Sequence, residues 1–322
     1  MELFESLKQK ISGKNKKIVF PEASDQRILQ AAAQLKQDNL LEPIFLGDAT
    51  NITQKASELG IEIKGISIID PNNYADYEYM VEAFVKRRNG KNSPEQAKNM
   101  LRDFNYFGTM LVYLGKADGM VSGIIHPTGD TVRPALQIIK TKPGIKRTSG
   151  AFIMQKGQKR YLFADCAINI DPSAEDLAEI AVMSAQTAKL FDIDQKVALL
   201  SFSTKGSAKG DAVDKVARAT QLAQELAPDI LIDGELQFDA ALVPSVAEQK
   251  APGSKVAGQA SVFVFPELQS GNIGYKIAQR LGGFEATGPI LQGLNKPISD
   301  LSRGANSEDV YKLALITAAQ AI

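Results

Sequence analysis

The residues with the clearest chemical potential lie close to the C-terminus, in the segment KPISDLSRGANSEDVYKLALITAAQA at 296–321. Ser302, Arg303 and Asp309 fall around one turn that leads into a helix, and Gly304 lets the backbone bend there. A hydroxyl, a guanidinium and a carboxylate at a helix N-terminus can hold an anion, orient a nucleophile and accept its proton. The segment therefore predicts a chemical site.

Asp309 also fits a purely structural role. If Asn306 is the N-cap, Asp309 is the third residue of the helix, where a carboxylate accepts from the cap amide and opposes the helix dipole. Spacing alone favours this role. The two roles predict different lesions, because losing a cap lowers stability whereas losing a catalytic group lowers turnover.

A second candidate site lies in the segment ADGMVSGIIHPTGDTVRPALQIIK at 117–140. Its sequence predicts a strand, a polar loop at 126–134 and then a helix. In α/β proteins, this order of elements presents backbone amide donors to phosphate at the helix N-terminus. Arg133 adds a fork suited to phosphate oxygens, and Thr131 lies in the same loop. The chain has no P-loop or dinucleotide motif to support this interpretation.

Two further segments, SFSTKGSAKGD at 201–211 and FPELQSGNIGYK at 265–276, read as polar loops after strands. Ligands of α/β proteins bind at the carboxyl ends of strands. Lys205, Lys209 and Lys276 would add positive charge there, although a lysine in a glycine-rich loop is more often only solvated. We take them as supporting candidates.

The chain has one cysteine, Cys166, and one histidine, His126. A single cysteine excludes an internal disulfide, and the pair makes a Cys/His zinc site implausible. No G-x-S-x-G elbow is present to build a Ser-His-Asp triad. We leave both residues out of the chemistry and predict no metal site.

Short apolar strands alternate with amphipathic helices along the chain. The segments at 17–20, 43–47 and 66–70 read as strands buried on both faces, as in a parallel sheet. Ser24 or Asp25 can cap the helix after the first strand. The alternation continues to the C-terminus and predicts a doubly wound α/β fold.

The 322 residues suggest two domains or one large one. Lys plus Arg and Asp plus Glu both number 37, so no global field would attract nucleic acid. No window approaches about 18 uninterrupted apolar residues, and the N-terminus lacks the apolar core of a signal peptide. We expect a cytoplasmic protein that binds neither nucleic acid nor a membrane.

The segment DLSRG at 300–304, followed by an acidic residue, resembles the active-site segment of the phosphate acetyltransferase family, also called phosphotransacetylase. The likeness is almost continuous over 250–304 and includes blocks at 117–150 and 233–252. It runs from the first strand to the last residues and is closest to the short, single-module form of the phosphate acetyl/butyryltransferase family.

The resemblance implies two doubly wound α/β domains with a cleft between them, as in isocitrate and isopropylmalate dehydrogenases. It places residues 1–145 and 297–322 in a discontinuous first domain and residues 146–296 in the second. It also implies a homodimer.

The resemblance implies reversible acetyl transfer between acetyl phosphate and coenzyme A, giving acetyl-CoA and phosphate, as in acetate metabolism. Coenzyme A is then a substrate, and neither a metal nor another cofactor is needed. Ser302 would hydrogen-bond the thiol or the tetrahedral oxygen, Arg303 would stabilise developing charge, and Asp309 would take the thiol proton.

The resemblance implies that Arg87 binds coenzyme A and that Arg133 binds coenzyme A or phosphate. The polar loops add two substrate-binding candidates from the residues themselves, Thr131 in the turn beside Arg133 and Lys276 in support. From the residues alone, Arg87 is equally well a solvated charge at a helix C-terminus.

Three alternatives remain open. A phosphate butyryltransferase would perform the same chemistry on a longer acyl chain. A hydroxy-acid dehydrogenase of the same fold would need a carboxylate metal site and a cofactor signature that the sequence lacks. A non-catalytic acetyl-CoA sensing module is the third, and the retention of Ser302, Arg303 and Asp309 argues against it.

Overall fold

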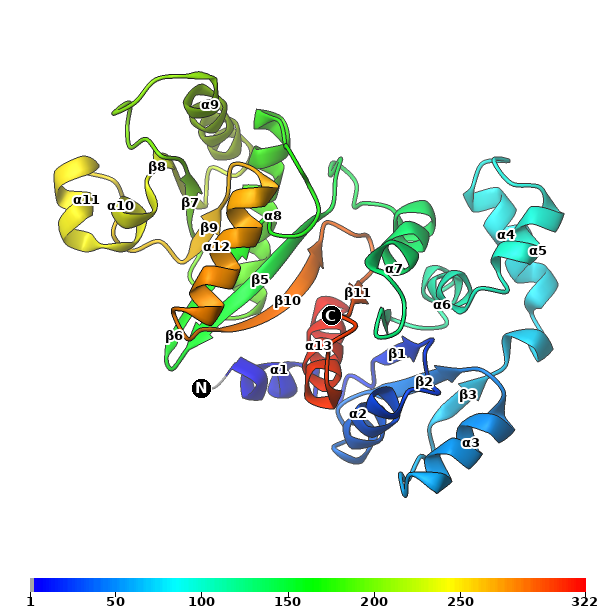
Figure 1. Ribbon diagram of the computed structural model, residues 1–322. Coiled ribbons are helices and arrows are strands. Elements are labelled where there is room, and N and C mark those ends of the chain that lie inside the picture. Colours follow the sequence, from blue (N-terminus) through cyan, green and yellow to red (C-terminus); the bar gives the residue numbers. More distant parts are fainter. Residues whose placement is uncertain (1–2) are drawn as a thin grey trace. The chain divides into compact units, whose positions relative to one another are not determined.

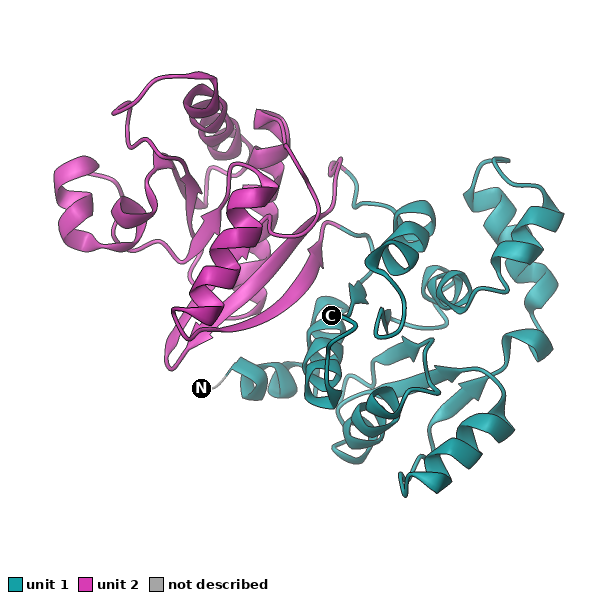
Figure 2. Cartoon of the chain, in the orientation of Figure 1, with its two compact units in different colours: residues 1–143, 294–322 teal, residues 144–293 magenta. Residues whose placement is uncertain are grey.

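The computed structural model describes residues 3–322, which divide into two compact units (Figure 2). Unit 1 runs to Pro143 and resumes at Leu294, so the chain leaves it and returns. Unit 2 is the intervening Gly144–Gly293.

Within the described residues, unit 1 is built on a five-stranded parallel sheet in the order β11-β4-β1-β2-β3 (Figure 1). Its strands are β1 (Lys17–Phe20), β2 (Glu42–Leu46), β3 (Ser67–Ile69), β4 (Gly119–Ser122) and β11 (Ile298–Asp300). Its helices are α1 (Leu3–Ile11), α2 (Gln26–Gln37), α3 (Ala49–Glu58), the 3₁₀ turn η1 (Pro71–Asn73), α4 (Tyr77–Arg87), α5 (Pro94–Met100), α6 (Phe104–Tyr113), α7 (Thr128–Pro134), the π-helix η2 (Ala135–Ile139) and α13 (Ser307–Gln320).

Helices cover both faces of the unit 1 sheet. Gly119 and Met120 are consecutive in β4, so the Cβ position of Gly119 and the side chain of Met120 lie on opposite faces of the sheet. A Cβ at Gly119 would lie 2.8 Å from Thr317 of α13, whereas the sulfur of Met120 lies 2.8 Å from the Cβ position of Gly108 in α6. This double cover explains the continuous apolar strands and confirms the α/β class predicted from the sequence.

Unit 2 contains, within the described residues, a six-stranded mixed sheet in the order β10-β5-β6-β9-β7-β8. Strand β5 is antiparallel to both neighbours, and the other pairs are parallel. The strands are β5 (Ser149–Lys156), β6 (Lys159–Ala164), β7 (Lys196–Leu200), β8 (Leu231–Leu236), β9 (Val262–Val264) and β10 (Glu285–Gln292). The helices are α8 (Ala174–Leu190), α9 (Asp211–Leu226), α10 (Phe238–Leu242), α11 (Pro244–Lys250) and α12 (Leu268–Arg280).

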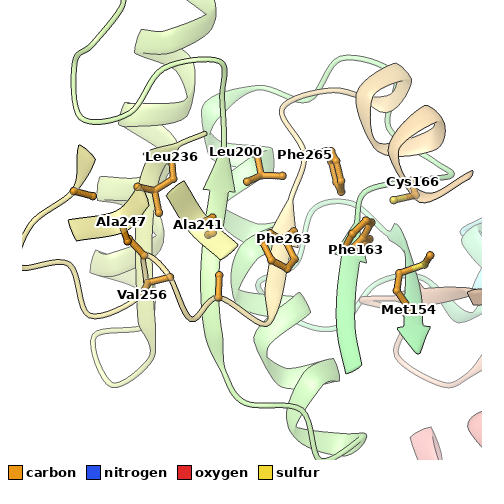
Figure 3. Close-up of a cluster of buried hydrophobic side chains, with 14 of the residues drawn as sticks. Met154, Phe163, Cys166, Leu200, Leu236, Ala241, Ala247, Val256, Phe263 and Phe265 are labelled. Atoms are coloured by element: carbon orange, nitrogen blue, oxygen red, sulfur yellow. The ribbon is translucent and has the colours of Figure 1, made fainter. Parts of the chain in front are cut away.

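Aromatic side chains dominate one face of the unit 2 sheet, where Figure 3 shows Phe163 and Phe263 on neighbouring strands. Their ring centroids lie 5.5 Å apart, edge to face. Phe152 of β5 stacks on Tyr275 of α12 with centroids 4.1 Å apart. The second of these contacts packs α12 against the sheet.

Several helix starts confirm the sequence-based predictions, since a cap depends only on neighbouring residues. Asp25 caps α2 and Asn306 caps α13, as predicted, and Ser93 and Ser173 cap α5 and α8 in the same way.

The expectation of a polar loop over 126–134 is wrong for most of that segment. Helix α7 begins at Thr128, so Thr131 and Arg133 lie on a helix. Pro134 is the last residue of α7, and without an N–H it cannot donate to the carbonyl four residues earlier, that of Asp130. The segment that follows α7 is a π-helix, where an ordinary helix was expected.

The expectation of a loop over 265–276 is also wrong. Helix α12 begins shortly after Glu267, whose carboxylate accepts from two amides of its first turn. Gly271 indicated a loop but serves close packing, because a Cβ there would lie 2.2 Å from the Asp165 carbonyl oxygen. Lys276 therefore projects from the middle of a helix.

Candidate functional site

Three neighbouring strands of unit 1 bring their carboxyl ends to one side of the sheet. The chain builds β1, β2 and β3 in one direction and then places β4 and β11 on the other side of β1. The order therefore reverses between β1 and β4, and ligands of open α/β sheets bind at the carboxyl ends beside such a point. We call the three loops found there, 21–25, 123–127 and 301–306, the carboxyl edge of unit 1.

Ser302 and Arg303 are exposed in the turn after β11. The amide of Ala305 donates to the Ser302 carbonyl at 2.9 Å, and the amide of Gly304 donates to the Ser302 hydroxyl at 3.3 Å. Within residues 3–322, Arg303 has no ion pair. A compact turn therefore presents a hydroxyl and an unengaged guanidinium to solvent.

Asp309 forms the capping box that its spacing predicts. Its amide donates to Asn306 Oδ1 at 2.9 Å, and its Oδ2 accepts from the Asn306 amide at 2.9 Å. No ion pair joins it to Arg303 in the described part of the chain. The structural role of Asp309 is confirmed, and its catalytic role remains a prediction.

Arg133 lies on α7, which packs against β11. Its side chain is 61% exposed, and Nη1 lies 3.9 Å from Asp130 Oδ1. At that distance and exposure the pair contributes little. The guanidinium is therefore free to bind an external anion, as the sequence predicts.

Thr131 is completely buried, which does not suit a residue that meets substrate directly. It lies behind the carboxyl edge near Asp300, the last residue of β11, which is 2% exposed. Burial raises the pKa of Asp300, and the hydroxyls of Thr128 and Thr131 partly oppose that shift. Thr131 Oγ1 and Asp300 Oδ1 are buried without a hydrogen-bond partner among the described residues, and the substrate contact of Thr131 remains a prediction.

Arg87 is half-buried and makes structural contacts. Its Nε donates to the Ile138 carbonyl at 2.5 Å, and Nη2 donates to the Ile139 carbonyl at 2.8 Å. Its guanidinium also lies 4.9 Å from the ring centroid of Tyr113. Arg87 thus satisfies the end of the π-helix, which favours a structural role, and the coenzyme A contact remains a prediction.

Lys276 belongs to unit 2 and is exposed on α12. Its Nζ donates to Asn272 Oδ1 at 2.5 Å and lies 5.4 Å from the Tyr275 ring centroid. The structure therefore gathers Ser302, Arg303 and Asp309 in unit 1, and it does not show Lys276 joining them.

Glu22, in the loop after β1, is a functional candidate that the sequence reasoning missed. Its carboxylate is 1% exposed and accepts from three consecutive amides of the loop after β4, those of Gly123, Ile124 and Ile125, at 2.9, 2.9 and 3.0 Å. The same carboxylate lies 2.7 Å from His126 Nδ1. Glu22 therefore fixes both the path of this loop and the ring of the chain's one histidine.

Arg27, at the start of α2, is a second missed residue. Its Nη1 donates to the carbonyls of Arg303 and Ala305 at 3.0 and 2.9 Å, and Nη2 reaches the Ile124 carbonyl at 3.4 Å. Asp25 holds the guanidinium from the other side with contacts of 2.8 and 2.9 Å. One side chain thus ties the turn after β11 to the loop after β4.

A sequence signal for both residues exists. The polar run EASDQR directly follows a buried strand, and polar groups at that position of an α/β unit face the carboxyl ends of the neighbouring strands. If this run is interpreted only as the start of a helix, it accounts for Asp25 but not for Glu22 or Arg27.

Among the described residues, no three or more His, Cys, Asp and Glu side chains are grouped where they could hold a metal ion. No helix within residues 3–322 is long and apolar enough to span a bilayer.

Comparison with known proteins gives consistent matches over the whole chain. A family model described as phosphate acetyl/butaryl transferase matches residues 2–318. The chain is 62% identical over 321 residues to a phosphate acetyltransferase of Bacillus subtilis (strain 168), covering 100% of this chain and 99% of the relative. It is 60% identical over 326 residues to one from Staphylococcus epidermidis (strain ATCC 12228 / FDA PCI 1200), with the same coverage.

Solved structures agree. A phosphotransacetylase from Streptococcus pyogenes superposes with a TM-score of 0.97 at 65% identity, and a EutD phosphotransacetylase from Staphylococcus aureus with 0.96 at 59%, each covering 99% of this chain and 98% of the other. A branched-chain phosphotransacylase from Enterococcus faecalis V583 shares the fold, with a TM-score of 0.67 at 20% identity, over 95% of this chain and 99% of the other.

Proposed function

This chain belongs to the phosphate acetyl/butaryl transferase family, and we propose that the carboxyl edge of unit 1 is where it performs its reaction. The reaction is the reversible transfer of an acetyl group between acetyl phosphate and coenzyme A, which makes acetyl-CoA and phosphate the other two substrates. The observation that supports this location of the active site is the exposed turn of Ser302 and Arg303, which lies beside the point where the strand order reverses.

The mechanism that these residues support is direct attack of the coenzyme A thiolate on the acetyl carbonyl in a ternary complex, without an acyl-enzyme. Arg303 stabilises the carbonyl oxygen as negative charge develops there, and such electrostatic help is often the largest single contribution in acyl transfer. Ser302 donates a hydrogen bond to the thiol or to the tetrahedral oxygen. Holding both substrates side by side removes much of the entropic barrier.

Arg133 is proposed to bind the phosphate that leaves. Its exposed guanidinium offers parallel N–H donors that match phosphate oxygens. It also compensates charge, since the leaving group carries more negative charge after the C–O bond breaks.

Asp309 was the sequence-based choice for the base, and two facts weigh against that role. An ordinary aspartate lies about 4.6 pKa units below a thiol, which makes the proton transfer uphill by about 6 kcal/mol. Its Oδ2 also already accepts the Asn306 amide. We keep Asp309 in the site as the cap that starts α13 directly after the Ser302 turn, and treat its role as base as a rival hypothesis.

We propose that catalysis needs no metal and no cofactor, because the Arg303 guanidinium can supply the positive charge. Dialysis against a chelator should then leave the rate unchanged. A loss of activity that added Mg²⁺ or Zn²⁺ restores would contradict this.

We also propose that the protein is a cytoplasmic homodimer. Support for self-association comes from a row of exposed apolar side chains along α12 and its C-cap, where Ile273, Ile277 and Leu281 are 55%, 52% and 85% exposed. Measuring the mass in solution tests the homodimer, and the Ile277→Lys variant is the control that should be monomeric. A monomeric wild type would contradict the proposal. Cell fractionation tests the location.

The test of the function is coenzyme A-dependent thioester formation from acyl phosphates, followed by ultraviolet absorbance. We expect rapid turnover with acetyl phosphate and a lower kcat/KM with butyryl phosphate. A preference for butyryl phosphate would favour the butyryltransferase alternative. Binding of acetyl-CoA by folded protein without turnover would favour the sensing module.

A further inference from the structure

Glu22 holds the imidazole of His126 by one ring nitrogen and leaves the other available. Glu22 Oε1 lies 2.7 Å from Nδ1, and the carboxylate is 1% exposed whereas the imidazole is 44% exposed. Three backbone amides also donate to this carboxylate, so both of its oxygens act as acceptors and Nδ1 carries a proton. Within residues 3–322, no protein group hydrogen-bonds Nε2. The ring is therefore fixed at Nδ1 and has one nitrogen for an external partner.

The guanidinium of Arg133 lies at the same short segment as this imidazole. Helix α7 begins two residues after His126, and the Asp130 amide donates to the Pro127 carbonyl at 2.9 Å. A Cβ at Gly129 would lie 3.7 Å from Arg133 Nη2, so the guanidinium folds back over the first turn of α7. An imidazole and a guanidinium therefore flank the first turn of one helix.

The loop that carries His126 also lies directly against the turn that carries Ser302. The amide of Leu301 donates to the Ser122 carbonyl at 2.7 Å. A Cβ at Gly123 would lie only 2.8 Å from the Leu301 carbonyl oxygen, so only glycine allows this approach. A ligand of the imidazole would therefore lie on the same surface as the Ser302 hydroxyl.

The charges around the ring favour an anion as that ligand. Besides Glu22, the charged side chains on the elements that meet here are Asp25 and Arg27 at the start of α2, Asp130 and Arg133 on α7, the buried Asp300 at the end of β11, and Arg303 in the turn after it. Asp25 pairs with Arg27 at 2.8 Å. The guanidiniums of Arg133 and Arg303 remain exposed, and only the 3.9 Å contact with Asp130 opposes the first of them.

We propose that His126, doubly protonated and fixed by Glu22, binds the phosphoryl group of acetyl phosphate through Nε2, next to Arg133. This inference rests on the proposed function and adds a second side chain to the phosphoryl site. A phosphate oxygen without a proton can only accept a hydrogen bond, so it selects the ring form in which Nε2 donates. Inorganic phosphate binds in the same place. His126 keeps both ring protons throughout the reaction, so no bond to hydrogen forms or breaks at the ring.

The same hydrogen bond assists the transfer itself. As the C–O bond of acetyl phosphate breaks, its electron pair goes to the phosphate oxygen, and the negative charge there increases. Donors placed where charge develops lower the barrier. Loss of His126 should therefore weaken the binding of phosphate and also lower kcat.

Binding through a protonated ring has a pH dependence of known sign. Imidazoles change charge between about pH 5 and 8. Because the protonated ring is the form that binds, the affinity for phosphate is greatest at the acid end of this range and falls as the pH rises through the titration of the ring. By linkage, bound phosphate must move the titration of the ring to higher pH. A histidine with only a structural role would show neither effect.

The test makes use of the chain's one histidine, whose imidazole signals in NMR spectra of protein labelled in histidine need no assignment. We expect saturating inorganic phosphate to move the midpoint of this titration upward by about one pH unit or more, because a hydrogen bond to a charged group contributes roughly tenfold or more in affinity. Sodium chloride at the same ionic strength is the control and should move the midpoint much less.

The matched variant is His126→Gln, which keeps an amide donor but cannot titrate. Calorimetry measures the affinity for phosphate in both proteins between about pH 6 and 9, with melting curves as the check on folding. The affinity should fall about tenfold more across this range in wild type than in His126→Gln. The titration of phosphate itself affects both proteins equally, so the comparison removes it.

The outcomes separate this inference from the function on which it rests. An inactive, folded wild type would overturn the function, and its histidine signals would still show whether phosphate binds at His126. An active wild type whose histidine signals do not respond to phosphate would overturn only the role of His126. Equal pH dependence of phosphate affinity in His126→Gln and wild type would overturn that role as well. If His126→Gln does not fold, the NMR titration of wild type decides.

Discussion

Glu22 in unit 1 and Asp165 in unit 2 are both buried carboxylates that organise the backbone of nearby loops. Glu22 accepts from three amides after β4. Asp165 accepts from the amides of Gly150, Ala167, Ile168 and Asn169 at 2.8–3.1 Å. Charge-assisted hydrogen bonds of this kind hold a loop in one conformation.

The two networks end differently. The hydrogen-bond network of Glu22 continues to the His126 imidazole, which is 44% exposed. That of Asp165 ends on Asn169, which is 8% exposed and donates to the Thr148 carbonyl at 2.8 Å. A buried carboxylate thus does not by itself mark a functional site, and the difference lies in whether its network presents a titratable group to solvent.

Basic residues after the strands of the two units differ in the same way. In unit 2, Lys205 contacts the Asp233 carboxylate and donates to the Gly234 carbonyl at 2.8 Å. In unit 1, Arg303 has no ion pair within residues 3–322. Arg303 therefore offers an unpaired positive charge, whereas the charge of Lys205 is already paired.

The largest expected effect on kcat comes from removing the positive charge of Arg303. Arg303→Gln should lower kcat by about a hundredfold or more, because charge on the carbonyl oxygen loses its partner. Lys205→Gln should change kcat by less than about threefold, because its charge is already paired. Initial rates at saturating substrates, with melting curves, measure both. Equal losses would remove the distinction between the units.

The second prediction compares the two buried carboxylates. Glu22→Gln and Asp165→Asn should each cost about 1–3 kcal/mol of stability, because an amide nitrogen replaces a buried acceptor. Only Glu22→Gln should also lower kcat per folded molecule, by roughly tenfold to a hundredfold. Urea unfolding and active-site-normalised rates measure these. A similar loss of kcat in Asp165→Asn would show that both networks serve only stability.

A smaller effect is expected in substrate binding. Arg133→Gln should raise the KM for acetyl phosphate about tenfold, as a charge-assisted hydrogen bond to phosphate contributes roughly 1.5–3 kcal/mol. Lys276→Gln should change that KM by less than about threefold. If Lys276→Gln had the larger effect, the phosphate would be bound by unit 2.

The smallest effect is expected at Asp309. Asparagine retains an oxygen that can accept the Asn306 amide, so Asp309→Asn should cost less than about 1 kcal/mol of stability, mainly from the lost charge at the helix N-terminus. Its kcat should stay within about threefold of wild type. A hundredfold loss with unchanged melting would instead identify Asp309 as the base.

The sequence predicts most elements and helix caps of this fold because those signals are local. Asn306 and Asp309 reveal the start of α13 from their spacing alone. The glycines of α12 mislead for the opposite reason, since Gly271 is explained only by the Asp165 carbonyl far away in the chain. Glycine indicates a loop unless the packing partner is known.

The distinction between local and long-range signals also applies to the candidate site. Ser302 and Arg303 are recognisable from one short segment. Glu22 and His126 are separated by 104 residues, and Arg27 and Arg303 by 276, so no local pattern connects them. His126 was therefore set aside as structural, and only the fold shows the carboxylate behind it. Arg87 is the converse case, because the resemblance implies a contact with coenzyme A and the structure shows two carbonyl partners.

The most direct test of the account is a crystal structure of the protein soaked with phosphate. We expect the phosphate beside the carboxyl edge of unit 1, within hydrogen-bond distance of the Arg133 guanidinium. A phosphate held only by the 201–210 loop of unit 2, with the carboxyl edge of unit 1 empty, would contradict it.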